Sequence, residues 1–255
     1  MNTEVDSKVL CLGYPIYNAP LSDLPIKSKL LVSTINQYSY CISEEDAVFK
    51  NALLASDVIL PDGVGIVAAA KWLNGVSIKK IAGADFHEYQ LKRLNEIHGS
   101  CFYLGASDKT LSKIGERLKK EYPNVTFACY APHYKPSFTE EDTAAMINAV
   151  NSFKPDVLFV GMTAPKQEKW SHAHKEDLDA KIICSIGAVF DFYAGTIERP
   201  NKIWQDLGLE WLGRLVKEPK RMGKRYIYYG AVFTKHLVKA KFTPECKVSG
   251  EVKVN

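Results

Sequence analysis

One aspartate, Asp62, stands where a carboxylate could serve as a general base. It lies in Leu60-Pro-Asp62-Gly63-Val-Gly65, between an apolar run that predicts a buried strand (Val58–Leu60) and an alanine-rich run that predicts a helix (Ile66–Leu73). The turn would place Asp62 at the carboxyl end of a strand, the edge at which open α/β sheets bind ligands. Pro-Asp-Gly is also an ordinary turn sequence, so spacing alone does not separate a base from a turn residue.

Other polar loops are predicted to reach the same edge. The apolar run from Leu30 ends in Thr34 and Asn36, which suggests a second strand tip facing the same cleft. Gly161–Glu168 and Ile186–Phe192 each follow a predicted strand and begin a helix, and helix starts offer free N–H groups to an anion or a sugar hydroxyl. Each loop alone could be a polar cap, but together they predict one ligand cleft.

The glycines of the same stretch allow a different interpretation. Gly63-x-Gly65-x-x-Ala68 follows a strand and opens a helix, and Asp85 lies near the offset of about 20 residues found in dinucleotide-binding folds. That pattern would indicate an NAD-type oxidoreductase. Against it, Asp62 precedes the first glycine, where its carboxylate would lie beside a pyrophosphate.

The sequence contains no convincing metal or nucleophile pattern. Asp177-Leu-Asp179 imitates a metal-binding Asp-x-Asp pair, but its charged surroundings favour a solvated loop, and His172 and His174 point to different faces of a helix. The six cysteines are scattered without a CxxC pair, which favours reduced thiols in a cytosolic protein.

The order of predicted strands and helices along the chain indicates the fold that would position these groups. Strands alternate with helices of about 10–15 residues, which is typical of a doubly wound, mostly parallel α/β sheet. Ser43 reads as the cap of a helix continuing through Ala47–Ala55, and the loop from Lys79 to Asp85 precedes another helix. Further alternating elements are predicted at Cys101–Leu104, Asp108–Glu121, Val125–Tyr130, Thr139–Phe153, Asp156–Gly161, Pro165–Ser171 and Lys181–Ile186.

The texture changes after Gly195. Residues 198–242 are rich in Lys and Arg with interleaved Trp, Tyr and Leu, a composition that fits either a helix on an anionic membrane surface or a helical pair packed on the sheet. The net charge of +4 and the absence of a binding motif argue against nucleic acid. We expect no signal peptide, and no apolar run reaches the roughly 20 residues needed to span a bilayer.

In combination these stretches resemble the WecG/TagA/CpsF family of bacterial glycosyltransferases over roughly Leu30 to Tyr229. The matching motifs are Thr34-Ile-Asn36, Leu60-Pro-Asp62-Gly63-Val-Gly65, Ala82-Gly83-Ala-Asp85, Tyr103-Leu-Gly105, Gly161-Met-Thr-Ala-Pro165-Lys-Gln167-Glu168, Gly187-Ala-Val-Phe-Asp191-Phe, Gly195-Thr-Ile-Glu-Arg199 and the long run from Leu209 to Tyr226.

The resemblance implies a Rossmann-like catalytic domain (1–197) and a basic amphipathic appendage (198–255) that completes the site at the membrane. It implies inverting transfer of a sugar, N-acetylmannosamine, its uronic acid or a related hexose, from a UDP donor. The acceptor would be a polyprenyl-diphosphate-linked sugar on the inner membrane face, in the synthesis of teichoic acid, capsule or another surface polysaccharide. It also leaves room for a homo-oligomer.

The site residues follow from the same motifs. Asp62 would be the base, acting with Thr34 and Lys80, where the family usually has arginine at the Lys80 position. No metal or other cofactor is expected, because cations are present to meet the diphosphate. The residues expected to bind substrate are Asn36, Gly63, Gly65, Gly105, Gln167, Asp191, Arg214, Arg221 and Arg225. The remaining alternatives are the NAD-type oxidoreductase and a non-catalytic nucleotide-sugar-binding protein at the membrane.

Overall fold

The computed structural model describes residues 7–25, 28–196, 212, 215 and 219–243, for residues 220 and 221 the backbone alone. Within this part of the chain, eight strands form one sheet. In chain order they are β1 (Lys8–Cys11), β2 (Tyr14–Tyr17), β3 (Leu30–Ile35), β4 (Val58–Pro61), β5 (Ser100–Gly105), β6 (Thr126–Tyr130), β7 (Val157–Gly161) and β8 (Ile182–Ser185).

The strand order is β1-β2-β4-β3-β8-β7-β5-β6, and β1 alone pairs antiparallel. The other pairs are parallel, so the prediction of a mostly parallel α/β sheet is confirmed. The strand at β2 was not predicted, because Pro15 and the Pro- and Asn-rich surroundings hide its pattern. Its tyrosines, Tyr14 and Tyr17, are nevertheless fully buried.

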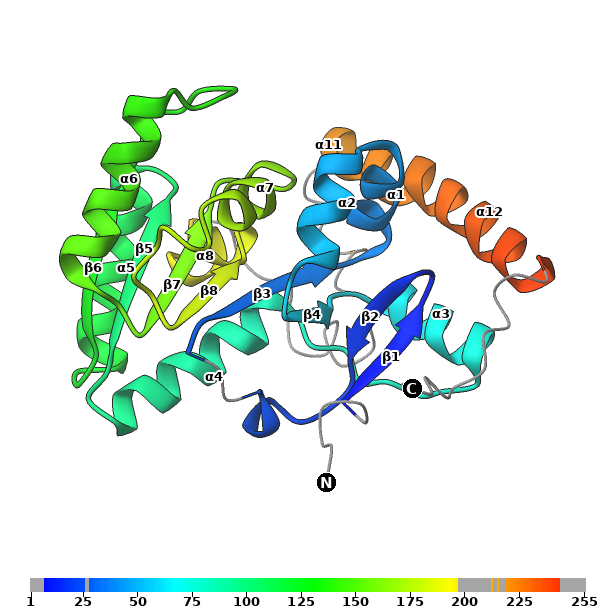
Figure 1. The fold of residues 1–255 in the computed structure, drawn as a ribbon, viewed down its shortest axis with the longest axis horizontal. Helices are drawn as coiled ribbons and strands as arrows, with labels where there is room; N and C mark the ends of the chain where they lie inside the picture. The colour runs from blue at the N-terminus through cyan, green and yellow to red at the C-terminus, as the bar shows by residue number, and fades with distance from the viewer. Residues whose placement is uncertain (1–6, 26–27, 197–211, 213–214, 216–218, 244–255) are drawn as a thin grey trace.

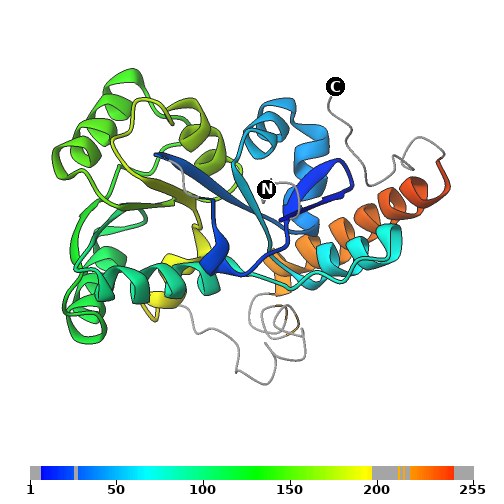
Figure 2. The same cartoon turned by 60° about the horizontal axis from the view of Figure 1, so that its bottom comes forward.

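Helices cover both faces of the sheet (Figures 1 and 2). One layer holds α4, α5 and α8, the other holds α1, α2, α6 and α7, and α3 lies beside β1. The described helices are η1 (Leu21–Asp23), α1 (Gln37–Glu45), α2 (Ala47–Leu54), α3 (Val64–Asn74), α4 (Gly83–Glu96), α5 (Asp108–Glu121), α6 (Glu140–Phe153), α7 (Lys166–Ala173), α8 (Ala188–Tyr193), α11 (Pro219–Gly223), η2 (Lys224–Tyr228) and α12 (Tyr229–Phe242).

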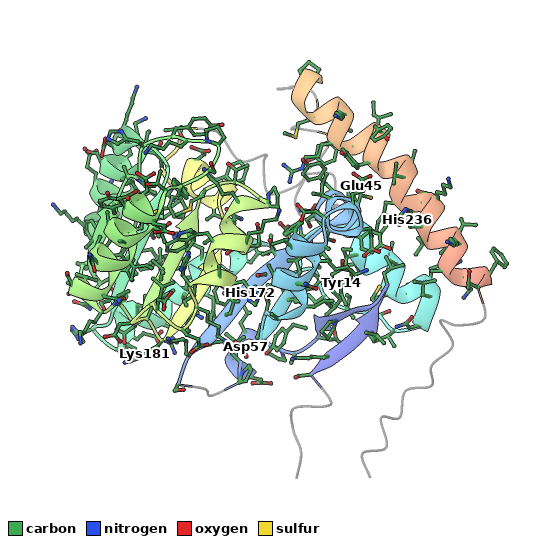
Figure 3. The ribbon with its side chains drawn as sticks, turned by 45° about the horizontal axis from the view of Figure 1, so that its top comes forward. Tyr14, Glu45, Asp57, His172, Lys181 and His236 are labelled. Atoms are coloured by element: carbon green, nitrogen blue, oxygen red, sulfur yellow. The ribbon has the colours of Figure 1, made fainter. Side chains whose placement is uncertain are left out.

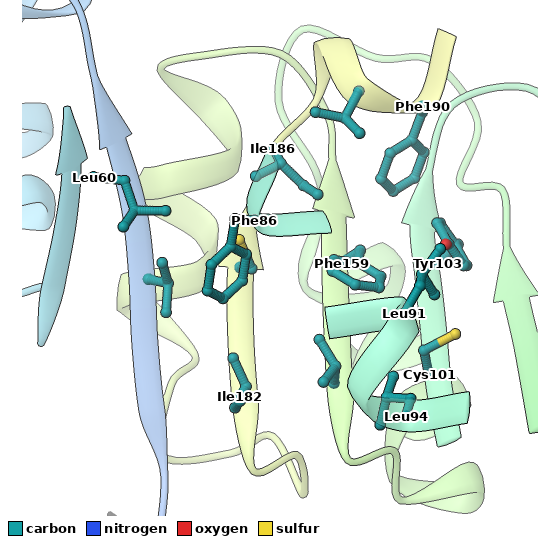
Figure 4. Close-up of a cluster of buried hydrophobic side chains, with 14 of the residues drawn as sticks. Leu60, Phe86, Leu91, Leu94, Cys101, Tyr103, Phe159, Ile182, Ile186 and Phe190 are labelled. Carbon is teal, nitrogen blue, oxygen red and sulfur yellow. The ribbon is translucent and has the colours of Figure 1, made fainter. Parts of the chain in front are cut away.

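An apolar cluster between the sheet and the helices α4 and α8 holds these helices in position. Phe86 and Leu91 of α4, Phe159 of β7 and Phe190 of α8 are each at most 1% exposed and meet in one apolar cluster (Figure 4). Burying a side chain of this size contributes about 1.5–3 kcal/mol. This cluster therefore holds the starts of α4 and α8 firmly against the carboxyl-terminal edge of the sheet.

The helix boundary predicted at Ser43 is wrong. α1 begins directly after β3, because the Asn36 side chain caps it by accepting the N–H groups of Tyr38 and Ser39 at 3.0 Å. Ser43 lies buried inside α1, 2.8 Å from the hydroxyl of Tyr14. The next helix, α2, is capped instead by Asp46.

The described C-terminal helix α12 packs on the sheet domain. Phe233 is 6% exposed within a cluster that includes residues of β2, α1 and α3, and His236 lies 3.4 Å from the hydroxyl of Tyr40 (Figure 3). Ile227, Tyr228 and Phe242 remain exposed. Of the two structures considered for the basic C-terminal region, the packed helix therefore applies to α12, and its outer side keeps an apolar component.

Candidate active site

One cavity of about 970 Å³ opens at the carboxyl ends of the parallel strands. Its walls come from the loops that follow β3, β4, β5, β6, β7 and β8, together with the segment before α4 and the start of η2. A space of this size accommodates a ligand larger than a single sugar. The predicted residues that line it are Thr34, Asn36, Asp62, Gly63, Lys80, Gly105, Gln167, Asp191 and Arg225.

Asp62 is held at the tip of β4 by its own backbone. Thr34 of β3 pairs with Leu60 of β4, and the Asp62 N–H donates to the Ile35 carbonyl at 2.8 Å. Gly63 then turns the chain into α3 with φ +115°, a conformation that side chains rarely adopt. The half-exposed Asp62 thus lines the cavity beside the end of β3, as the sequence predicted.

The second glycine of the same motif has a packing role. A Cβ at Gly65 would lie 2.9 Å from Gln37 Oε1, so the glycine lets α3 approach α1, and Gly65 does not line the cavity. Asp85 caps α4 by accepting the Ala82 N–H at 2.9 Å. Both positions of the apparent dinucleotide pattern are therefore explained by local packing and capping.

Lys80 reaches the cavity from the loop before α4. The N–H of Ile81 donates to the Pro61 carbonyl at 3.0 Å and ties this loop to the end of β4. Half-buried Lys80 accordingly lies on the same wall of the cavity as Asp62. A cation here is suited to a phosphate oxygen, although lysine lacks the two-pronged geometry of arginine.

Gly105 marks the closest backbone contact of the site. Its φ is +118°, and a Cβ there would lie 2.7 Å from the Gly161 carbonyl carbon, with the carbonyl oxygen closer still. The next residues carry the chain to Ser107, which caps α5 by accepting the Thr110 N–H. The start of α5 therefore borders the cavity, where its N–H groups can bind an anion.

Both polar atoms of the Gln167 amide form hydrogen bonds within the protein. Its Oε1 accepts the Gly187 N–H at 3.1 Å, and its Nε2 donates to Glu168 Oε1 at 2.8 Å. The amide joins the start of α7 to the start of α8. The Gln167 amide has a second N–H, which these two hydrogen bonds do not use.

Glu168 is a cavity residue to which the sequence assigned no role. It is 3% exposed, and burial raises the pKa of its carboxyl from 4.5 to about 7, although the hydrogen bond from Gln167 and the charge of Arg225 favour ionisation. A glutamate is almost never fully buried unless it is paired. Its burial follows from packing, so no local signal could have revealed it.

The raised pKa of Glu168 predicts a pH-dependent stability. The folded chain keeps a proton that the unfolded chain releases between pH 4.5 and about 7, so rising pH lowers the free energy of unfolding across that window. Glu168→Gln removes this effect. Between these pH values we expect the free energy of unfolding of wild type to fall by up to about 3 kcal/mol more than that of Glu168→Gln, as measured by urea unfolding. Glu96→Gln, on the exposed side of α4, reports the background change, and parallel wild-type and Glu168→Gln curves would contradict the expectation.

The C-terminal segment contributes cations and aromatic rings to the site. The Arg225 guanidinium lies 4.3 Å from the centre of the Tyr38 ring, and Lys224 and Tyr226 also line the cavity. Asp191, which also lines the cavity, accepts a hydrogen bond from the Thr196 hydroxyl at 3.1 Å. Arg214 and the side chain of Arg221 lie outside the described residues.

A further group at the mouth of the cavity was missed by sequence reasoning. Lys166 stacks 4.2 Å from the centre of the Phe138 ring and donates to the Lys135 carbonyl at 2.7 Å, while Tyr134 beside it is 96% exposed. Desolvation lowers the pKa of Lys166. The group unites the loop after β6 with the start of α7, and only the topology of the sheet brings these segments together.

Within the described residues no group of three or more His, Cys, Asp or Glu side chains is placed to hold a metal ion. Asp177 lies on the surface, 3.2 Å from His174. No described helix is both long and apolar enough to cross a membrane. None of the cysteines in this part of the chain forms a disulfide.

Comparison with known proteins gives one consistent result. A model described as glycosyl transferase WecG/TagA/CpsF family matches residues 16–247. Two proteins of Staphylococcus aureus, from strains MW2 and MRSA252, are 27% and 28% identical over 197 residues, which is 77% of this chain and 76% of each relative. Both are named N-acetylglucosaminyldiphosphoundecaprenol N-acetyl-beta-D-mannosaminyltransferase. All residues predicted for the site fall within the range matched by the family.

Proposed function

The chain belongs to the WecG/TagA/CpsF family of glycosyltransferases, and we propose that it transfers a sugar from a UDP donor to a polyprenyl-diphosphate-linked sugar with inversion. The donor sugar is N-acetylmannosamine, its uronic acid or a related hexose. The names of the Staphylococcus aureus relatives support an N-acetylmannosaminyl group and an acceptor of the GlcNAc-diphosphoundecaprenol type. The product would enter surface polysaccharide or teichoic acid synthesis.

One observation carries the proposal: a carboxylate and several cations border the same large cavity. Asp62 lies at the carboxyl end of β4, and the cations Lys80, Lys166, Lys224 and Arg225 also line the cavity. A sugar diphosphate needs this combination, because a base must act at the sugar end while positive charge meets the diphosphate.

The proposed reaction is a single displacement at the anomeric carbon. The acceptor hydroxyl attacks that carbon, its proton passes to Asp62, and the bond from the anomeric carbon to the diphosphate oxygen breaks to release UDP. The negative charge that develops on the departing diphosphate would be met by Lys80 and by the N–H groups at the start of α5. These groups could perform this role without a metal ion.

We propose that the acceptor diphosphate meets the C-terminal appendage (198–255) at the inner face of the cell membrane, where the protein is peripheral. Arg225 brings positive charge from the described part of the appendage into the cavity. The basic residues Lys235, Lys239 and Lys241 of α12, with exposed Tyr228 and Phe242 nearby, have the composition of a surface that binds anionic lipid.

A product assay tests the function. UDP-sugars are supplied with a short-chain GlcNAc-diphospholipid acceptor, and the mass of any product is measured in excess EDTA, with and without added Mg²⁺ or Mn²⁺. We expect a product heavier than the acceptor by one residue of the sugar that the productive UDP donor carries, formed equally well in EDTA. Binding of NAD(H) without UDP would favour an oxidoreductase, binding of UDP-sugar without product would favour a non-catalytic protein, and activity restored by a metal would refute metal independence.

Arg225 tests the contribution of the appendage. With a water-soluble short-chain acceptor, Arg225→Ala should lower kcat/KM for the acceptor by about 10- to 100-fold, because a charge-assisted contact of roughly 1.5–3 kcal/mol is lost. Arg225→Lys should recover part of this loss. Lys235→Ala, exposed on α12 and away from the cavity, is the matched control and should stay near wild type. Equal kinetics for all three variants would remove Arg225 from the site.

A further inference from the structure

Glu168 differs from the other buried polar groups of the described chain. Five buried side-chain N or O atoms there have no hydrogen-bond partner, and they belong to Gln90, Arg93, Trp170 and Glu168. Only Glu168 lines the cavity. It is also the only acidic side chain among the buried residues of the described part. Unpaired buried polar atoms are rare and call for an explanation.

The two oxygens of Glu168 have different surroundings. Oε1 accepts from Gln167, whose own orientation is fixed by the Gly187 N–H, while Oε2 is the atom without a partner. The carboxyl is thus held in place through Oε1, while Oε2 is buried, has no hydrogen-bond partner and lies within the electrostatic influence of Arg225. By contrast, Asp156 is paired through both oxygens, with Ser100 and Lys181, at the opposite end of the sheet.

We propose that Glu168 Oε2 binds a hydroxyl group of the transferred sugar, as a substrate-contacting carboxyl in addition to those predicted from the sequence. This inference rests on the proposed function. It extends that function by assigning a sugar-specific contact to a residue outside the base and the diphosphate cations.

The chemistry of the site selects a hydroxyl over a phosphate oxygen. A hydroxyl can donate to a carboxylate and can accept from a carboxylic acid, so it satisfies Oε2 in either protonation state. A phosphate oxygen can pair only with the protonated form, and the ionised form repels it. Since burial brings the pKa of Glu168 to about 7, both forms are populated near neutral pH, and a hydroxyl fits both.

The test separates sugar binding from nucleotide binding. Calorimetry measures the Kd of UDP-N-acetylmannosamine and the Kd of UDP for wild type, Glu168→Gln and Glu168→Met. Methionine keeps the length of the side chain but removes both oxygens, whereas glutamine keeps a neutral hydrogen-bonding group. We expect the Kd of UDP-N-acetylmannosamine divided by the Kd of UDP to rise about 10-fold in Glu168→Met and less in Glu168→Gln. The Kd of UDP itself should stay within about 2-fold of wild type.

Singly deoxygenated UDP-sugars give an independent result. The analogue that lacks the contacting hydroxyl should bind wild type about 10-fold more weakly and should lose nothing further in Glu168→Met, because the two changes remove the same contact. Asp156→Asn is the control for general destabilisation and should leave the ratio unchanged.

The outcomes discriminate clearly. An unchanged ratio in both Glu168 variants, as a bound water would produce, overturns the inference. A parallel loss of UDP and UDP-sugar binding, or a Glu168→Met protein that does not fold together with an unchanged ratio in Glu168→Gln, assigns Glu168 a structural role and also overturns it. Wild type that binds neither ligand overturns the proposed function and the inference with it.

Discussion

Replacing Asp62 by asparagine is expected to lower turnover by about 10²- to 10⁴-fold, because the amide cannot take the proton of the acceptor hydroxyl. The fold should persist. The bond from the Asp62 N–H to the Ile35 carbonyl belongs to the backbone, and the turn that follows depends on Gly63. UDP-sugar affinity should remain within a few-fold of wild type. Steady-state kinetics with calorimetric binding would measure both.

Asp57, at the other end of β4, provides a matched control. Asp57 lies directly before β4, whereas Asp62 lies directly after it (Figure 3). The Asp57 carboxylate accepts hydrogen bonds from Lys175 at 2.9 Å and from the Leu31 N–H at 2.8 Å. Asp57→Asn should therefore weaken the fold while leaving turnover per folded molecule near wild type. If Asp62→Asn keeps turnover within a few-fold of wild type while folded, Asp62 is not the base.

Replacing Gly105 by alanine is expected to destabilise the protein by about 3 kcal/mol or more. Two effects combine. The backbone at Gly105 has φ +118°, which is strained for alanine. The new methyl group would also overlap the backbone carbonyl of Gly161, which is fixed by the pairing of β5 with β7. Separating β5 from β7 would also displace the loop to Ser107 on the cavity wall. Urea unfolding gives the stability, and the product assay gives the loss of turnover.

Gly75→Ala isolates the backbone contribution. Gly75 ends α3 with φ +71°, but nothing lies within 4 Å of the position its Cβ would take. This variant should lose only about 1 kcal/mol, from the left-handed conformation alone. Equal losses in the two glycine variants would show that the close approach to Gly161 is unimportant.

Many helix and strand boundaries could be predicted from the residues next to them in the sequence. The helix Asp108–Glu121 was predicted with its observed bounds, and the element predicted at Thr139–Phe153 is α6, which begins at Glu140 with Thr139 as its cap. Such signals lie within a few residues of the boundary that they specify. The prediction failed at Ser43 because two helices meet there, and the stronger caps are Asn36 and Asp46.

The candidate site was predicted in part. The position of Asp62 follows from a strand, a turn and a helix in immediate succession, and the parallel sheet then requires the other strand tips to share its edge. The role of Gly65 was not predictable, because its partner Gln37 is remote in sequence. Family resemblance supplied the substrate class, which neither spacing nor composition contains.

The sequence by itself determined the alternation of strands and helices, most of their caps and the turn that carries Asp62, since each depends on neighbours along the chain. Only the tertiary structure decided which side chains share the cavity, that Glu168 is buried with one oxygen unpaired, and that α12 packs against α1. Burial, a shifted pKa and a close backbone approach are set by segments that come together only when the sheet forms, so no local pattern encodes them.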